Sequence, residues 1–162
     1  MASTIKTFLE EINEIEYQLI AIHTSLEDYR LAYFINKELT LNLTKCNDDL
    51  HVIVKQGETN FARFHFDDES KSITWNLIEN KSNFINTENL SVKDLFSMQE
   101  NAFSSTTYLI PEYKKVNFFL KIESENNLKL TEFVKKINAI DKIALVYSVD
   151  KDKIKSKINL IF

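Results

Sequence analysis

Glycine and proline are scarce in this chain of 162 residues, in which Gly57 is the only glycine and Pro111 the only proline. Phosphate-binding loops need several glycines, because backbone N–H groups must approach the anion closely. The sequence therefore excludes a Walker-type loop and a Rossmann dinucleotide-binding loop. It also excludes the Gly-x-Ser-x-Gly turn that presents the nucleophile of α/β-hydrolases.

Cysteine and arginine are equally rare. Cys46 is the only cysteine, so the chain cannot form an internal disulfide. Arg30 and Arg63 are the only arginines among 20 basic residues, and the formal net charge is −4. Base readout and bidentate phosphate contacts favour arginine, so the composition disfavours a dedicated nucleic-acid-binding protein but leaves a local basic patch open.

Long apolar runs and metal-ligand spacings are also missing. No apolar run follows a basic start, and every apolar stretch is far shorter than the ~20 residues of a membrane-spanning helix. We therefore expect a cytoplasmic protein without a signal peptide or a membrane segment. His23, His51, His65 and Cys46 are scattered along the chain, so we predict neither a metal site nor a cofactor.

Hydrophobic and aromatic residues are plentiful, at 44% and 12% of the chain. A chain of this length buries a sufficient core without disulfides or metals. We therefore expect a single domain over residues 1–162. The surplus of aromatic residues predicts a thick core, with some aromatic surface left to face a partner.

Hydrophobic periodicity predicts an α+β fold with a largely antiparallel sheet, two long helices packed on one face and an N-terminal helix. A doubly buried strand is expected over 17–23 and a hairpin over 61–66 and 73–78, whereas residues 79–106 have little regularity apart from a short helix at 91–96. Ser25 is the expected cap of the second helix. The remaining predicted helices span 4–15, 25–38 and 130–137, and the remaining strands 39–43, 50–55, 107–110, 115–123, 143–149 and 158–162.

Strict alternation within residues 115–123 predicts which side chains face the core. Val116, Phe118, Leu120 and Ile122 are expected to point inward, and residues such as Lys121 outward. Phe119 breaks the outward polar pattern. It is therefore a candidate for an exposed aromatic contact with a partner.

His23 is the best enzymatic candidate, because it ends a buried strand just before a predicted helix. With Asp28 and Arg30 it forms a possible acid–base group. The alternative, which we favour, is that the ring packs and bonds a backbone carbonyl, while the charges cap the helix and Glu27 pairs with Arg30. Enzymatic activity is therefore uncertain, and we favour a non-enzymatic protein.

Lysines recur at every second position near the carboxyl end of the chain. Lys153, Lys155 and Lys157 are candidate phosphate contacts. Asp150 and Asp152 interrupt this run, which favours a solvated connection over a nucleic-acid site.

Residues 109–118 read LIPEYKKVNF and contain the only proline. They resemble the signature of the IPExxxVDY family, which occurs in Bacteroidota. Ile110, Pro111, Glu112 and Val116 match the signature, whereas its closing aspartate and tyrosine are replaced by asparagine and phenylalanine. Residues 20–33 and 155–162 also resemble this family, so the resemblance spans nearly the whole chain.

The resemblance implies no activity that can be carried over to this chain. It implies genes for fatty-acid synthesis, ribonuclease III and pyruvate kinase as neighbours, and hence a housekeeping role. Asn117 removes the charge of the family's aspartate, so no catalytic aspartate is expected there. Pro111 is expected to bend the chain between two strands. Glu112 is expected to accept N–H bonds in that bend or to pair with Lys114.

Three hypotheses about function remain. The first is a protein-interaction or adaptor module that binds another protein through an edge strand or an aromatic surface, with Tyr113, Phe119 and residues 160–162 as candidates. The second is an accessory RNA-binding or ribosome-associated protein that uses the lysines of residues 151–157. The third is a small enzyme with a site near His23. The sequence leaves the oligomeric state open.

Overall fold

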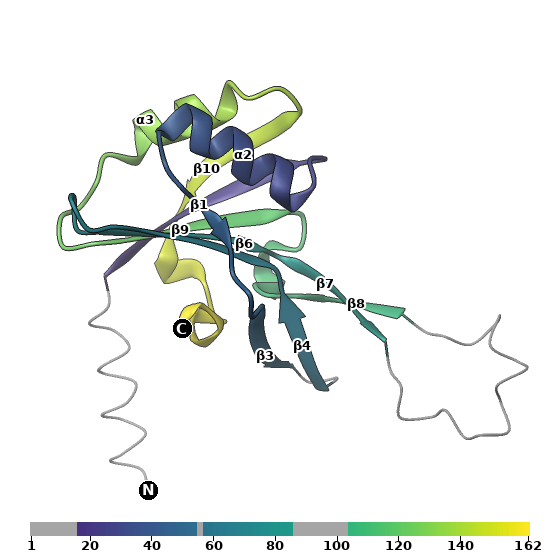
Figure 1. The fold of residues 1–162 in the computed structure, drawn as a ribbon. Helices are drawn as coiled ribbons and strands as arrows, with labels where there is room; N and C mark the ends of the chain where they lie inside the picture. The colour runs from purple at the N-terminus through teal and green to yellow at the C-terminus, as the bar shows by residue number, and fades with distance from the viewer. Residues whose placement is uncertain (1–15, 55–56, 86–103) are drawn as a thin grey trace, which may run out of the picture.

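The computed structural model describes residues 16–54, 57–85 and 104–162, which form a six-stranded antiparallel sheet with two helices and two outlying hairpin ladders (Figure 1). The strand order is β10-β1-β9-β6-β5-β2. The α+β prediction with a largely antiparallel sheet is confirmed. The elements are β1 (Tyr17–Thr24), α2 (Asp28–Leu39), β2 (Thr44–Lys45), β3 (Leu50–Val54), β4 (Gly57–Phe61), β5 (Arg63–Asp68), β6 (Ile73–Glu79), β7 (Lys81–Ile85), β8 (Ser104–Tyr108), the 3-10 turn η2 (Pro111–Tyr113), β9 (Phe118–Ser124), α3 (Leu130–Asn138), β10 (Ile143–Val149), and the 3-10 turns η3 (Lys151–Lys153) and η4 (Lys157–Leu160).

One face of the sheet packs against α2 and α3, which lie on the same side of it in Figure 1. Leu31 and Ile35 of α2 and Ile137 of α3 join one apolar cluster with alternate residues of the central strands. We refer to this side as the helix face. The α3 helix has only nine residues, so the prediction of two long helices is not confirmed. The predicted helices at 4–15 and 91–96 lie outside the described residues.

The opposite face of the sheet is also buried, as the doubly buried strand expected over 17–23 requires, but the sequence did not predict what covers it. Leu19, Ala21 and Phe119 point to this side and join a second apolar cluster. Its cover comes from the β3–β4 hairpin, from the segment around η2, and from Ile154 and Leu160 near the carboxyl end. We refer to this side as the loop-covered face, because most of its cover has no regular secondary structure.

Two predictions about β9 are therefore wrong. Phe119 is fully buried, and Lys121 is only 2% exposed. Lys121 forms an ion pair with Glu123, and its ammonium lies 4.4 Å from the centroid of the Phe162 ring and 5.3 Å from that of Tyr17. Strand alternation identifies one buried face, but it cannot reveal a second cover that is supplied by distant irregular segments.

Three predicted local features also differ from the structure. Ser25 does not cap α2, which begins at Asp28; the hydroxyl of Thr24 instead accepts a hydrogen bond from the N–H of Leu26 at 3.0 Å. Residues 39–43 form no strand, because α2 runs to Leu39 and ends at Thr40 in a left-handed conformation, with φ 56°. Residues 158–162 form no strand either, because η4 turns Leu160 into the loop-covered core.

The hairpin predicted over residues 61–66 and 73–78 is confirmed. β5 and β6 pair antiparallel, with Phe64 opposite Leu77 and Phe66 opposite Trp75. Part of the segment expected to be irregular also forms a ladder, since β7 pairs with β8. This ladder leads the chain into η2, where the candidate site begins.

Candidate functional site

The side chain of Asn80 holds the segment that contains the signature residues. Its amide donates hydrogen bonds to the carbonyls of Tyr113 and Val116, each at 2.9 Å. Its oxygen accepts a hydrogen bond from the N–H of Ile110, also at 2.9 Å. Asn80 is fully buried, so these bonds replace a strand ladder that the irregular segment cannot form. The segment becomes a fixed wall above the sheet.

Pro111 stands at the start of η2, where a proline costs no helical hydrogen bond. Its neighbour Glu112 accepts hydrogen bonds from the N–H groups of Lys155 and Ser156 at 3.0 Å each, and from the hydroxyl of Ser156 at 3.1 Å. Glu112 therefore accepts N–H bonds as predicted, but the donors lie more than 40 residues away instead of in the bend. Within the described residues it clamps the carboxyl-terminal segment.

An open groove of about 430 Å³ lies between this wall and strands β1 and β10. Its apolar surface comes from Pro111, Tyr113, Val116, Leu145 and Tyr147, and His23 lies among them. We call it the His23 groove. His23 and Leu145 are directly opposite each other in the β1–β10 ladder.

His23 and Tyr147 form the polar part of the groove. His23 Nε2 lies 3.4 Å from the Tyr147 hydroxyl, and the two ring centroids are 5.7 Å apart. Burial, with a smaller contribution from Tyr113, raises the pKa of the Tyr147 hydroxyl above its ordinary value. The hydroxyl is therefore protonated at neutral pH and can donate a hydrogen bond. The site combines an aromatic surface with one hydroxyl and one imidazole.

Strand β10 borders this groove and is the outermost strand of the sheet. Its residues, IALVYSV, include no charged residue and no proline. Ala144, Leu145 and Ser148 are exposed, and the Leu145 side chain is 50% exposed. Among the described residues, β10 forms a ladder with β1 alone. Its other edge presents backbone N–H and C=O groups without a strand partner in this part of the chain.

The structure does not bring His23 together with Asp28 and Arg30. His23 lies two residues after Ala21 in β1, so its side chain points to the same loop-covered face. Asp28 and Arg30 belong to α2, which packs on the helix face. The geometry therefore gives no support to the acid–base group of His23, Asp28 and Arg30. His23 is separated from Asp28 and Arg30, although they are close in sequence, because the chain crosses to the helix face between β1 and α2.

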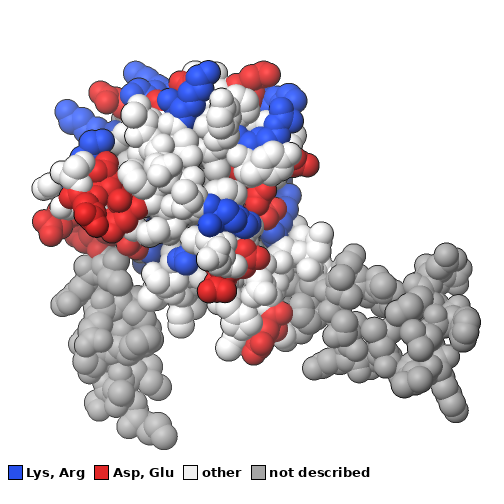
Figure 2. Space-filling view, in the orientation of Figure 1, with Lys and Arg blue, Asp and Glu red and all other residues white. Residues whose placement is uncertain are grey.

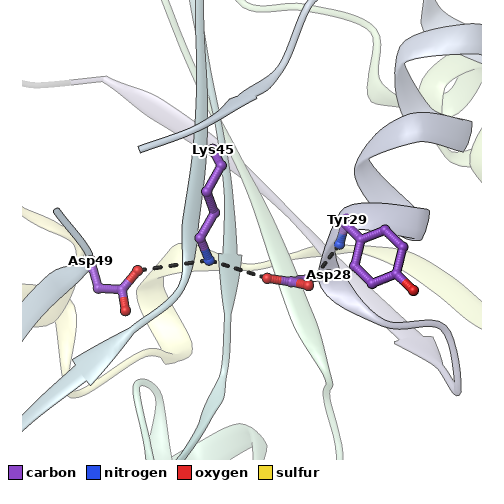
Figure 3. Close-up of polar contacts among 4 residues, drawn as sticks. All are labelled: Asp28, Tyr29, Lys45 and Asp49. Carbon is purple, nitrogen blue, oxygen red and sulfur yellow. Dashed lines mark hydrogen bonds and ion pairs between the residues drawn. The ribbon is translucent and has the colours of Figure 1, made fainter. Parts of the chain in front are cut away.

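Asp28 instead belongs to a charged cluster beside β2 (Figure 3). Lys45 Nζ lies 3.1 Å from Asp28 Oδ2 and 3.7 Å from Asp49 Oδ1, and the N–H of Tyr29 donates to Asp28 Oδ1 at 2.7 Å. Burial raises the pKa of the nearby Glu79 carboxyl, and the charge of Asp28 adds to this effect. The lysine between two carboxylates fits an ion-pair cluster that joins α2 to β2 and offers no aligned nucleophile.

The predicted phosphate-contacting lysines are partly neutralised by their neighbours. Lys153 lies 3.8 Å from Asp150, and Lys157 lies 3.8 Å from Asp152. Lys155 is exposed, and its backbone is bound by Glu112. In the view of Figure 2, basic and acidic side chains are interspersed instead of forming one continuous positive surface. The arrangement gives little support to an RNA-binding face.

The residues predicted to form aromatic or apolar contact surfaces differ in how far they are buried. Phe119 and Leu160 are fully buried, so they cannot contact a partner in this fold. Phe162 is 41% exposed, and its ring lies 5.0 Å from the guanidinium of Arg63. Tyr113 is half-buried and lines the His23 groove.

Sequence reasoning missed Leu145 and Tyr147. It recognised β10 as a strand but had no means of placing it at the edge of the sheet. The absence of charge and proline from residues 143–149 was the only available signal, and a central strand has the same composition.

No family model matches the sequence, and no curated protein or solved structure is similar enough to count as a match. The resemblance to the IPExxxVDY family therefore stays a prediction. No helix in the described ranges is both long enough and apolar enough to cross a membrane. Within those same ranges, no three or more His, Cys, Asp and Glu side chains gather as metal ligands would.

Proposed function

We propose that this protein is a non-enzymatic interaction module that binds an extended segment of another protein along β10. The observation that carries the proposal is the edge of β10, which has no charged residue and no proline, beside the His23 groove. In this mode of recognition the partner adds a strand to the sheet. Main-chain hydrogen bonds supply affinity, and a neighbouring pocket for alternate side chains supplies specificity.

Edge strands in natural proteins are normally protected against pairing. Short length, charged side chains, prolines and bulges are the usual means of protection. β10 has seven residues and carries no charge and no proline. Its one irregularity is a bulge at its start, where His23 lies opposite Leu145 and Thr24 opposite Ile143, so that Ala144 is an extra residue on β10 and residues 145–149 form the regular part of the edge. Such an edge in the described part of the fold supports a role in pairing with another chain.

The two alternative functions have less support. RNA would bind through lysines such as Lys153 and Lys157, whose charges are already partly neutralised by Asp150 and Asp152. An enzyme at His23 would need a base or nucleophile within reach, and the polar contact of its ring among the described residues is with the Tyr147 hydroxyl at 3.4 Å. Neither arrangement favours catalysis or phosphate binding over peptide docking.

The test is selection of peptides from a random decapeptide library displayed on phage, with the full chain as the target. The affinity of each enriched peptide is then measured by fluorescence anisotropy for the wild type and for two variants. Ser148→Lys puts a charge on β10, and Thr44→Lys puts one on β2. We expect Ser148→Lys to abolish binding and Thr44→Lys to preserve it. If no peptide is enriched, or if both variants bind equally well, β10 is not the docking edge.

A further inference from the structure

We infer that the docked segment carries a large apolar or aromatic side chain flanked by acidic residues. This inference rests on the proposed function, because it specifies the chemistry of the segment that β10 receives. It is carried by two features of the His23 groove, namely its aromatic lining and the lysines at its rim.

The lining of the groove selects the central side chain. Tyr113, Tyr147 and Leu145 offer ring and aliphatic surface, and Leu145 is half exposed while nothing from the described residues fills the groove. Its volume of about 430 Å³ accommodates one large side chain. Burial of an aromatic ring against other rings is favourable both through the area removed from water and through edge-to-face contacts.

The rim of the groove selects the flanking residues. Lys114 and Lys115 follow η2 and are both exposed. Neither of them forms an ion pair with another described residue, and Lys114 Nζ lies 5.9 Å from the centroid of the Tyr108 ring. Glu112 also lines the groove, but its Oε1 accepts three hydrogen bonds from residues 155 and 156. Two lysines against one carboxylate leave the rim with a net positive charge.

A protein segment fits this combination better than a nucleic acid does. Two lysines without an arginine give no bidentate phosphate contact. The uncharged β10 edge offers N–H and C=O groups in alternation, which matches a peptide backbone and has no counterpart in a phosphate backbone. The acidic residues would supply steering and register more than affinity.

The probe is a set of four synthetic decapeptides with a threonine- and serine-rich extended host sequence. The central residue is tryptophan or alanine, and the residues two positions away on each side are both glutamate or both lysine. Binding to the full chain is measured by fluorescence anisotropy of a terminal label. We expect the tryptophan–glutamate peptide to bind tightest. Replacing tryptophan by alanine should weaken binding about tenfold, and replacing glutamate by lysine about two- to fivefold.

Matched variants locate these preferences on the protein. Leu145→Ser, at a half-exposed position, should reduce the tryptophan preference, whereas Tyr33→Ser on α2, which removes a side chain that is 64% exposed, should not. The double variant Lys114→Glu and Lys115→Glu should reverse the glutamate preference. Lys135→Glu and Lys136→Glu on α3, both at exposed positions, should leave that preference unchanged. The glutamate preference should also weaken with added salt.

The outcomes separate this inference from the proposed function. If all four peptides bind equally and Ser148→Lys abolishes their binding, then β10 pairs with extended chains and the inferred side-chain chemistry is wrong. If none of the four binds at millimolar concentration, the inference is overturned. The phage selection then decides separately whether β10 binds any other extended segment.

Discussion

The two edges of the central sheet are protected to different degrees. At one edge β2 has only two residues and includes Lys45, and β5 beside it ends with Asp67 and Asp68. At the other edge β10 has seven residues without a charge or a proline. Short length and charge discourage pairing with another chain, so the comparison indicates which edge is available to a partner.

Each edge lies near a loop that is held by one asparagine side chain. Asn36 of α2 donates to the carbonyl of Leu43 at 3.0 Å and accepts from the N–H of Leu43 at 2.8 Å, just before β2. Asn80 makes three such bonds beside the His23 groove, and it is fully buried whereas Asn36 is half-buried. The difference predicts that the β10 side of the molecule depends more strongly on its asparagine.

Asn80→Ala should have the largest effect of the changes considered. It leaves the carbonyl of Val116 and the N–H of Ile110 without the partner that Asn80 supplies in a buried setting. The carbonyl of Tyr113 also loses a hydrogen bond but still accepts one from the N–H of Val116 at 3.0 Å. We expect the free energy of unfolding to fall by about 3 kcal/mol or more. Chemical denaturation measures this, with Asn138→Ala at the exposed end of α3 as the control. A loss below about 1 kcal/mol would show that the wall does not depend on this side chain.

Asn36→Ala should have an intermediate effect, about 1–2 kcal/mol, because two half-buried hydrogen bonds are lost. The higher helix propensity of alanine offsets a few tenths of a kcal/mol. The same denaturation experiment gives the comparison with Asn80→Ala. An equal or larger loss for Asn36→Ala would contradict the proposed difference between the two edges.

Glu112→Ala should cost less, about 1 kcal/mol, because its three hydrogen bonds lie at the surface. The expected signature is local. Amide hydrogen exchange at Lys155 and Ser156 should become faster, while exchange in β1 and β9 stays unchanged. Glu132→Ala on α3 serves as the control, and unchanged exchange at residues 155 and 156 would rule out the clamp.

Glu79 should have the smallest effect, visible only as a dependence on pH. Because burial raises the pKa of its carboxyl in the folded state, the folded protein binds the proton more tightly than the unfolded chain. The contribution of Glu79 to stability is therefore fully present below the unfolded pKa of about 4.3 and is lost as pH rises through the higher folded value. Relative to Glu79→Gln, the wild type should lose stability over this range. If the wild type instead gains stability relative to Glu79→Gln as pH rises, the pKa of Glu79 is lowered in the folded state and not raised.

The fold was predictable from the sequence where periodicity was strong. The apolar run of β1, the hairpin pattern of β5 and β6 and the alternation of β9 identified these elements, and Pro111 marked the bend at η2. The burial of Phe119 was not predictable, because its cover comes from Ile154, Leu160 and other residues in segments without periodicity. Alternation reports one face of a strand and says nothing of a distant loop that covers the other.

The candidate site was predictable only in part. His23 and Tyr113 were singled out from the sequence, and both line the groove. Their neighbour Tyr147 lies 124 residues from His23 along the chain, and only the β1–β10 pairing brings the two together. Asp28 and Arg30 were grouped with His23 because they are close in sequence, but the turn between β1 and α2 places them on the other face.

The central claim is that β10 and the His23 groove together receive an extended peptide. Titration of the tryptophan–glutamate decapeptide into the ¹⁵N-labelled full chain, followed by NMR chemical shifts of the backbone amides, tests this most directly. The account predicts that the largest changes fall in residues 143–149, in residues 112–116 and at His23. Changes confined to α2 or to the β2 edge, or no changes at saturating peptide, would contradict it.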